Sequence, residues 1–207
     1  MMTKHYITLL FSAALLTATM SCNKGRQNGP TVPATAMDSD SIQQTQSTVF
    51  GICGDDVAMN TLQLLTDSGD TLNLSIERAK TAGQVKGSYE PGDRMAVVMN
   101  DKHEVKAVIN ETVLMGNWVM PNPLDGSSTV GIRIKDGGIA ESIEQPSIIY
   151  KTWKIVNGQL ELTMVREGGG DMEESETFAI QKLDADSLII SNEADHLEFG
   201  REKQQSH

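Results

Sequence analysis

The side chains best suited to chemistry in this sequence are two histidines and one cysteine. His103 and His196 each stand beside an acidic residue, and neither lies in a motif with a serine, a cysteine or a metal-ligand set. Cys53 ends the apolar run Val49–Cys53, which favours a buried side chain over a nucleophile, because no base or second thiol is near it in sequence. We therefore predict no enzyme. Paired carboxylates for sugar hydrolysis stay open, because spacing across a barrel is invisible in sequence.

Cofactor and metal sites are also not expected. The acidic residues gather at Asp171, Glu173, Glu174 and Glu176. Such a block of like charge indicates a solvated hairpin tip rather than a metal site. Gly168–Gly170 lacks the Lys and Ser/Thr that follow in a phosphate-binding loop. The 11 methionines are dispersed, which favours core filling over a soft-metal site.

The charge balance argues against nucleic acid as a partner. The chain carries 17 Lys and Arg against 28 Asp and Glu, for a formal net charge of −11. Its basic residues form no run, and binding to a phosphate backbone needs clustered Lys and Arg.

Cys22 closes a different pattern at the N-terminus. A weakly basic start is followed by an apolar run from Ile7 to Ala18, and the small residue Ser21 stands directly before Cys22. The arrangement resembles a bacterial lipoprotein signal. The resemblance implies a signal peptide over residues 1–21 and attachment of acyl chains such as palmitate to Cys22. Thr19 departs from the aliphatic residue usual at its position. Cleavage nearby, leaving Cys22 an ordinary thiol, is the alternative.

The same resemblance implies a location. The apolar run is shorter than the roughly 20 residues that span a bilayer as a helix, which disfavours a retained transmembrane anchor. We expect a lipoprotein of a Gram-negative cell envelope, anchored in the outer membrane by its N-terminal lipid and facing the periplasm. Residues 22–47 are polar and rich in Gly, Pro, Ser and Thr, and they predict a disordered tether. The polar residues 202–207 predict a frayed tail.

Residues 48–112 show short strand signals and one helix signal. The strands are expected at Thr48–Cys53, Thr61–Thr66, Thr71–Ile76, Met95–Met99 and Val105–Ile109, and the helix at Glu77–Ala82. The segment Gly92–Val98 resembles one common in OB-type small barrels. Such barrels often bind oligonucleotides or sugars, but the expected binding face lacks clustered basic residues and stacking aromatics, since Phe50 and Tyr89 are the only aromatics of the region. A small OB-like barrel with a structural or protein-contact role is the prediction.

Residues 113–201 predict a second barrel. Eight short strand signals follow one another at intervals of about ten residues, as in an antiparallel up-and-down barrel or sandwich. Turns are expected at Lys135–Gly138 and at Val156–Gln159, where Asn157 and Gly158 form a hairpin turn.

This second region resembles the lipocalin-like lipoproteins of bacteria. Lipocalins open their first strand with a Gly-x-Trp motif, which Gly116 and Trp118 match. The resemblance implies an eight-stranded barrel that Trp118 closes at one end, against a basic residue from the last strand. Arg201 is the candidate, through a cation–π contact. The region is shorter than a full lipocalin, which argues against a roomy cavity.

Two further aromatic residues are candidates for ligand binding. Tyr150 and Trp153 stand three places apart on one expected strand, so they should point to opposite faces, one inward and one outward. With the Pro121–Ser128 loop, they would form the mouth of the barrel. Trp118 is a third candidate for ligand contact, although a structural role in closing the barrel is favoured for it. The leading interpretation is a non-catalytic binding module for a small apolar molecule or peptide. Its competitor is an interaction protein with filled barrels that contacts another envelope protein.

Overall fold

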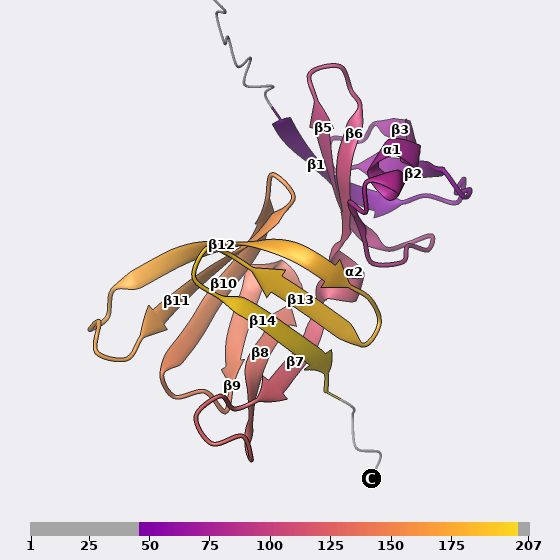
Figure 1. Ribbon diagram of the computed structural model, residues 1–207. Coiled ribbons are helices and arrows are strands. Elements are labelled where there is room, and N and C mark those ends of the chain that lie inside the picture. The colour runs from indigo at the N-terminus through magenta and orange to yellow at the C-terminus, as the bar shows by residue number, and fades with distance from the viewer. Residues whose placement is uncertain (1–45, 203–207) are drawn as a thin grey trace, which may run out of the picture. The chain divides into compact units, whose positions relative to one another are not determined.

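The computed structural model describes residues 46–202, all of which belong to one compact unit of the chain. They form two sheets and a few short helical turns (Figure 1). The all-β class predicted from sequence is therefore confirmed. The predicted signal, Cys22, most of the tether and most of the tail lie outside the described residues.

The first sheet contains six strands in the order β3-β2-β1-β5-β6-β4. Its elements are β1 (Gln46–Cys53), β2 (Thr61–Thr66), β3 (Thr71–Ser75), α1 (Glu77–Thr81), β4 (Val85–Lys86), β5 (Arg94–Asn100) and β6 (Val105–Asn110). The long strand β1 pairs antiparallel with both β2 and β5. Gly69 takes a positive φ of 93° in the turn between β2 and β3, a conformation that glycine adopts at no steric cost.

This first part differs from the small barrel that the sequence predicted. In the described pairing the sheet is open, because the short strand β4 occupies the free edge of β6 and does not pair with β3. Packing explains the difference. One face of β5 and β6, including Ala96, Val98 and Ile109, joins the same hydrophobic core as the second sheet. The sheet therefore buries this face without closing on itself.

The second sheet is a closed antiparallel barrel, as predicted. It is preceded by α2 (Glu111–Leu114) and consists of β7 (Gly116–Pro121), β8 (Thr129–Lys135), the turn η1 (Asp136–Gly138), β9 (Ile139–Ile143), β10 (Ile148–Val156), β11 (Gln159–Arg166), β12 (Glu173–Leu183), β13 (Ser187–Ser191) and β14 (His196–Arg201). The first strand β7 pairs with the last strand β14, through Val119 with Gly200 and Trp118 with Arg201. Asn157 and Gly158 have positive φ values of 50° and 80°, as a tight hairpin turn requires.

Strand β5 is buried on both faces, which explains its unbroken apolar sequence. Met95, Val97 and Met99 face a core of the first sheet, whereas Ala96 and Val98 face the core shared with the barrel. Backbone contacts add to this packing, since the Gly87 amide donates to the Leu183 carbonyl at 3.0 Å. The two sheets are therefore joined by a common core.

Two of the domain boundaries expected from sequence differ slightly from the structure. Strand β1 begins at Gln46, so Gln46 and Ser47 pair with Asn100 and Met99 instead of belonging to the tether. Helix α2 spans the predicted domain boundary between residues 112 and 113. The chain therefore passes from the first sheet to the barrel through an ordered turn of helix.

Candidate ligand pocket

Trp118 fills one end of the barrel. It is fully buried, and its indole Nε1 donates a hydrogen bond to the Leu114 carbonyl at 2.7 Å. The Arg201 guanidinium carbon lies 4.1 Å from the centre of the Trp118 ring, a cation–π distance. Gly116 has a φ of 137°, and a side chain there would collide with the Arg201 guanidinium. The three residues that the lipocalin resemblance named therefore meet at one place.

Arg201 also ties the barrel to α2. Its Nη1 donates to the Met115 carbonyl at 2.8 Å and its Nη2 to the Val113 carbonyl at 2.6 Å. These carbonyls lie at the C-terminal end of α2, where backbone acceptors lack helical partners. The guanidinium thus satisfies the helix end and covers the Trp118 ring at the same time.

The interior of the barrel is filled by side chains. Its buried residues include Ile132, Ile134, Leu160, Leu162, Met164, Phe178, Leu188, Ile190 and Phe199. A cavity of about 80 Å³ remains at the end away from Trp118, lined in part by Met120, Tyr150, Met164 and Phe178. This volume is far below the roughly 300 Å³ of a small ligand pocket. The barrel itself therefore offers little room for a ligand.

Tyr150 and Trp153 do not point to opposite faces as predicted. Both are buried, with 7% and 8% of their surface exposed. The register between β10 and β11 shifts between Tyr150 and Thr152, so Lys151 is an extra residue in β10. A bulge of one residue reverses the alternation of side chains beyond it. Both aromatic residues consequently face inward. The prediction from sequence was wrong because it assumed that side chains alternate regularly along the whole strand.

The small cavity at the barrel mouth has a polar rim. Arg166 Nη2 lies 2.6 Å from Glu176 Oε1, and the other carboxylate oxygen of Glu176 is buried without a hydrogen-bond partner in the described residues. Burial raises the pKa of the Tyr150 hydroxyl to about 12, so Tyr150 stays protonated at neutral pH. Tyr150, which the sequence placed at the mouth, lines this cavity, and so does Met120, which directly precedes the Pro121–Ser128 loop.

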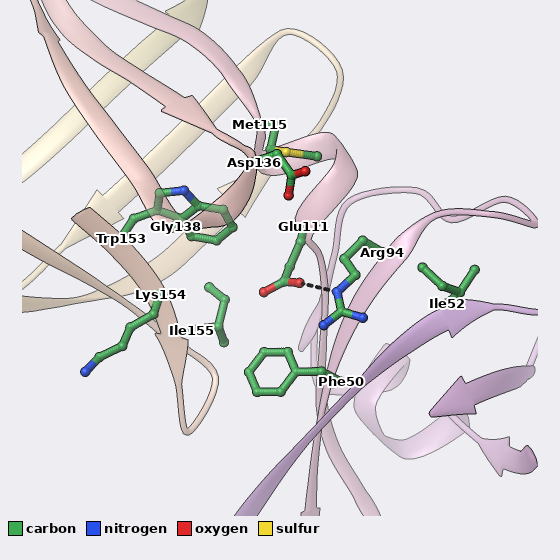
Figure 2. Close-up of a pocket in the computed structure, with 10 residues that line it drawn as sticks. All are labelled: Phe50, Ile52, Arg94, Glu111, Met115, Asp136, Gly138, Trp153, Lys154 and Ile155. Atoms are coloured by element: carbon green, nitrogen blue, oxygen red, sulfur yellow. Dashed lines mark ion pairs between the residues drawn. The ribbon is translucent and has the colours of Figure 1, made fainter. Parts of the chain in front are cut away.

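Trp153 instead contributes to a larger pocket between the first sheet and the barrel (Figure 2). The pocket has a volume of about 530 Å³, within the range of small-molecule sites. We call it the junction pocket. Its lining residues are Phe50, Ile52, Arg94, Glu111, Met115, Asp136, Gly138, Trp153, Lys154 and Ile155. Strands β1 and β5 and helix α2 supply one wall, and η1 and β10 supply the other.

The apolar wall of the junction pocket is held in place by backbone contacts. The Trp153 indole Nε1 donates to the Lys135 carbonyl at 2.7 Å, which fixes the ring beside η1. Phe50 is on β1 opposite Ala96, and the Arg94 guanidinium carbon lies 5.8 Å from the centre of its ring. The two aromatic rings and Ile155 point toward a common space in Figure 2.

Glu111 is the unusual polar residue of the junction pocket. Only 8% of its surface is exposed, and its Oε2 lies 3.3 Å from Arg94 Nε. Burial raises the pKa of the Glu111 carboxyl above its ordinary value, Arg94 acts in the opposite direction, and Asp136 adds to the rise. The pocket therefore contains an acidic group whose charge is costly to keep.

The comparisons with known proteins concern the C-terminal part of the chain. The family model described as lipocalin-like matches residues 110–202. A crystal structure of a lipocalin-like protein from Bacteroides thetaiotaomicron VPI-5482 is 32% identical, and the match covers 44% of this chain and 97% of that chain. The C-terminal part of this chain is a lipocalin-like domain. The TM-score between this chain and that structure is 0.40. The comparison with curated proteins finds no match.

The lipocalin-like domain has the fold of a binding module, and its family is generally non-catalytic. Both histidines that the sequence analysis considered lie on the surface. His103 is exposed in a turn, and His196 Nε2 lies 3.0 Å from Glu198 Oε1 on the surface of β14. Within residues 46–202, no group of three His, Cys, Asp or Glu is arranged to hold a metal ion.

Cys53 is buried, as predicted. Burial raises the pKa of its thiol, and Asp93 and Asp55 add to the rise, which disfavours the reactive thiolate. In the acidic hairpin, Glu174 and Glu176 both pair with Arg166. None of the described helices is long and apolar enough to cross a membrane.

Sequence reasoning missed most of the junction pocket. It singled out Trp153, but it treated Phe50 as one of few aromatics in a small barrel and gave Arg94 and Glu111 no role. Their meeting depends on the packing of β1 and β5 near β10, which no local pattern encodes. One signal was present in the sequence: Glu111 directly follows the apolar strand β6, which placed a carboxylate next to the core. Buried carboxylates are rare, so this position was worth considering as a site.

Proposed function

We propose that this chain is a lipid-anchored lipoprotein of the Gram-negative cell envelope that binds a small apolar molecule or peptide without catalysis. The observation that carries the proposal is the junction pocket, with a volume of about 530 Å³ and walls that include Phe50, Trp153 and Ile155. The ligand would bind between the first sheet and the lipocalin-like domain. The barrel interior, with its cavity of about 80 Å³, would be structural.

The anchor is proposed from the sequence around Cys22. Acyl chains on Cys22 would hold the protein in the outer membrane, facing the periplasm, and residues 23–45 would separate it from the lipid surface. Mass spectrometry of the N-terminal peptide from native membranes tests this: a diacylglyceryl-modified Cys22 is expected. An unmodified peptide beginning elsewhere would refute the anchor and leave the binding proposal standing.

The binding proposal is tested by filling the pocket. Ile52 lines it with 37% of its surface exposed, so Ile52→Trp should occupy the space with little cost to the fold. Ile149 is similarly exposed at 48%, lies on a strand as well, and is absent from the pocket lining. Ile149→Trp is therefore the matched control. Native mass spectrometry of the chain purified from its own envelope should show a bound molecule in the parent and in Ile149→Trp, and none in Ile52→Trp.

A second candidate function rests on the filled barrel. If the protein acts by contact with another envelope protein, it needs no cavity, and exposed apolar residues such as Ile149 and Met172 could serve that contact. In this case the purified parent chain carries no small molecule. Cross-linking in the envelope would then capture a partner, and Ile149→Trp would weaken the capture more than Ile52→Trp.

A further inference from the structure

We infer that the junction pocket selects a ligand that carries an ammonium group on an apolar body. This inference rests on the proposed binding function and names the chemical class of the ligand. It follows from how the charges at the pocket are paired and from the position of Glu111.

The two basic side chains of the pocket are already neutralised from outside it. Arg94 makes two hydrogen bonds to Asp67, with Nη2 2.6 Å from Oδ2. Lys154 Nζ lies 2.8 Å from Glu161 Oε1. Neither Asp67 nor Glu161 lines the pocket. Each basic group already faces a carboxylate, and Arg94 also approaches Glu111, so an anionic ligand would meet little uncompensated positive charge.

The acidic side chains of the pocket are less well neutralised. Glu111 approaches Arg94 through Oε2 alone, at 3.3 Å. Its second oxygen has no protein partner in the described structure, and it points toward the space bounded by Phe50, Ile155 and Trp153 in Figure 2. Asp136 lies on the same pocket and is exposed. If the partners outside the pocket are counted as well, the two basic side chains are outnumbered by four acidic ones: Asp67, Glu111, Asp136 and Glu161.

Aromatic side chains strengthen this preference. Trp153 and Phe50 line the pocket beside Glu111, and an aromatic ring face attracts a cation. An ammonium group would donate a charge-assisted hydrogen bond to the free oxygen of Glu111 while the apolar body contacts Phe50, Trp153 and Ile155. Binding would also offset the cost of the buried carboxylate, whose charge Arg94 meets on one side alone.

The test compares three probes with one apolar body: 4-phenylbutylamine, 4-phenylbutanol and 4-phenylbutyrate. The full chain is held in lipid nanodiscs and titrated at neutral pH by calorimetry, with empty nanodiscs as the blank. The alcohol can also donate to Glu111, but it lacks the positive charge of the amine, so we expect the amine to bind about tenfold more tightly than the alcohol. The carboxylate should bind more weakly than both.

Two variants assign the preference to the pocket. Glu111→Gln should reduce the advantage of the amine over the alcohol to about twofold or less. Asp136→Asn changes an exposed residue, keeps an Oδ1 that can accept the hydrogen bond from the Gly137 amide, and should reduce the advantage partly. Asp171→Asn, also exposed but remote from the pocket lining, is the matched control and should change nothing. Asp136→Asn keeps the test valid if Glu111→Gln fails to fold.

The outcomes separate this inference from the proposed function. Equal binding of all three probes, tighter binding of the carboxylate, or an amine preference that survives both variants would overturn the ammonium class and leave the binding module intact. If no probe binds and the chain carries no native ligand, the proposed function fails, and this inference fails with it.

Discussion

The barrel interior and the junction pocket are lined by similar apolar and aromatic side chains, but they differ greatly in free space. The barrel leaves about 80 Å³ at its mouth, and the junction pocket leaves about 530 Å³. In the barrel, side chains from facing strands meet across a short distance and interdigitate. At the junction, β5 and β6 pack against the barrel core while β1 and β10 leave room between them. A small lipocalin-like barrel can thus gain a pocket by packing against a second sheet.

The largest expected effect is on the free energy of unfolding, when a tryptophan is removed from each of the two regions. Trp118→Ala should lower the free energy of unfolding by about 3–5 kcal/mol, because it leaves a closed cavity in the core. Trp153→Ala should cost at least about 1 kcal/mol less, because water can enter the pocket that Trp153 already lines. Urea denaturation followed by circular dichroism measures both. Equal costs would mean that the junction pocket is not open to solvent in the native protein.

A second prediction concerns the closed end of the barrel. Gly116→Ala should destabilise the protein by about 1–3 kcal/mol, because alanine is strained at a φ of 137° and would collide with Arg201. Gly169→Ala is the control, since Gly169 has no positive φ and its nearest neighbour would be 3.4 Å away. Thermal unfolding should show a clear loss for the first variant and little change for the second. A neutral Gly116→Ala would show that Arg201 can leave Trp118 without cost.

A smaller effect is expected from the pH dependence of Glu111. The pKa of Glu111 is raised in the folded protein, so protonation of its carboxyl group favours the folded state. The stability that this protonation contributes is fully present below the ordinary glutamate pKa. It is lost as the pH rises through the raised pKa of the folded protein. Glu111→Gln removes this dependence. The variant should therefore gain stability relative to the parent between acidic and neutral pH. The groups facing Glu111 are Arg94, Asp67 and Asp136, and Asp171→Asn serves as the control that should follow the parent.

The smallest effect concerns Tyr150 at the barrel mouth. Its hydroxyl should ionise near pH 12, and Tyr150→Phe should remove the last step of the tyrosinate absorbance titration. The stability change should be below about 1 kcal/mol, since the ring stays in place. The pKa of Tyr89 is also raised by burial, so Tyr89→Phe identifies the other described step. An ordinary tyrosine pKa for Tyr150 would show that the mouth is wet and larger than about 80 Å³.

Strands and turns were the part of the fold that the sequence predicted best. Alternating apolar runs bounded by Gly, Asn and Asp placed β2 at its observed limits and predicted the eight strands of the barrel. These features are local, because turn residues and side-chain alternation act over a few positions. The Gly116, Trp118 and Arg201 constellation also came from sequence, but through a family resemblance and not through spacing.

Features that depend on long-range packing were not predictable. The bulge at Lys151 changes the direction of Trp153, yet nothing in the residues around it marks one extra position. The first sheet stays open because β4 occupies the edge of β6 and does not pair with β3. This strand has two residues and is too short to produce a periodic pattern. The junction pocket combines residues from β1 to β10, and the distance between such segments in space cannot be read along the chain.

The pairing of β7 with β14 also sets an order of events during synthesis. The barrel joins its first strand to its last, and Arg201 of β14 covers Trp118 of β7 and holds the end of α2. A ribosome must therefore release β14 before the barrel wall can be completed. Until then the nascent chain exposes the apolar side chains of seven strands, which chaperones would have to protect from aggregation.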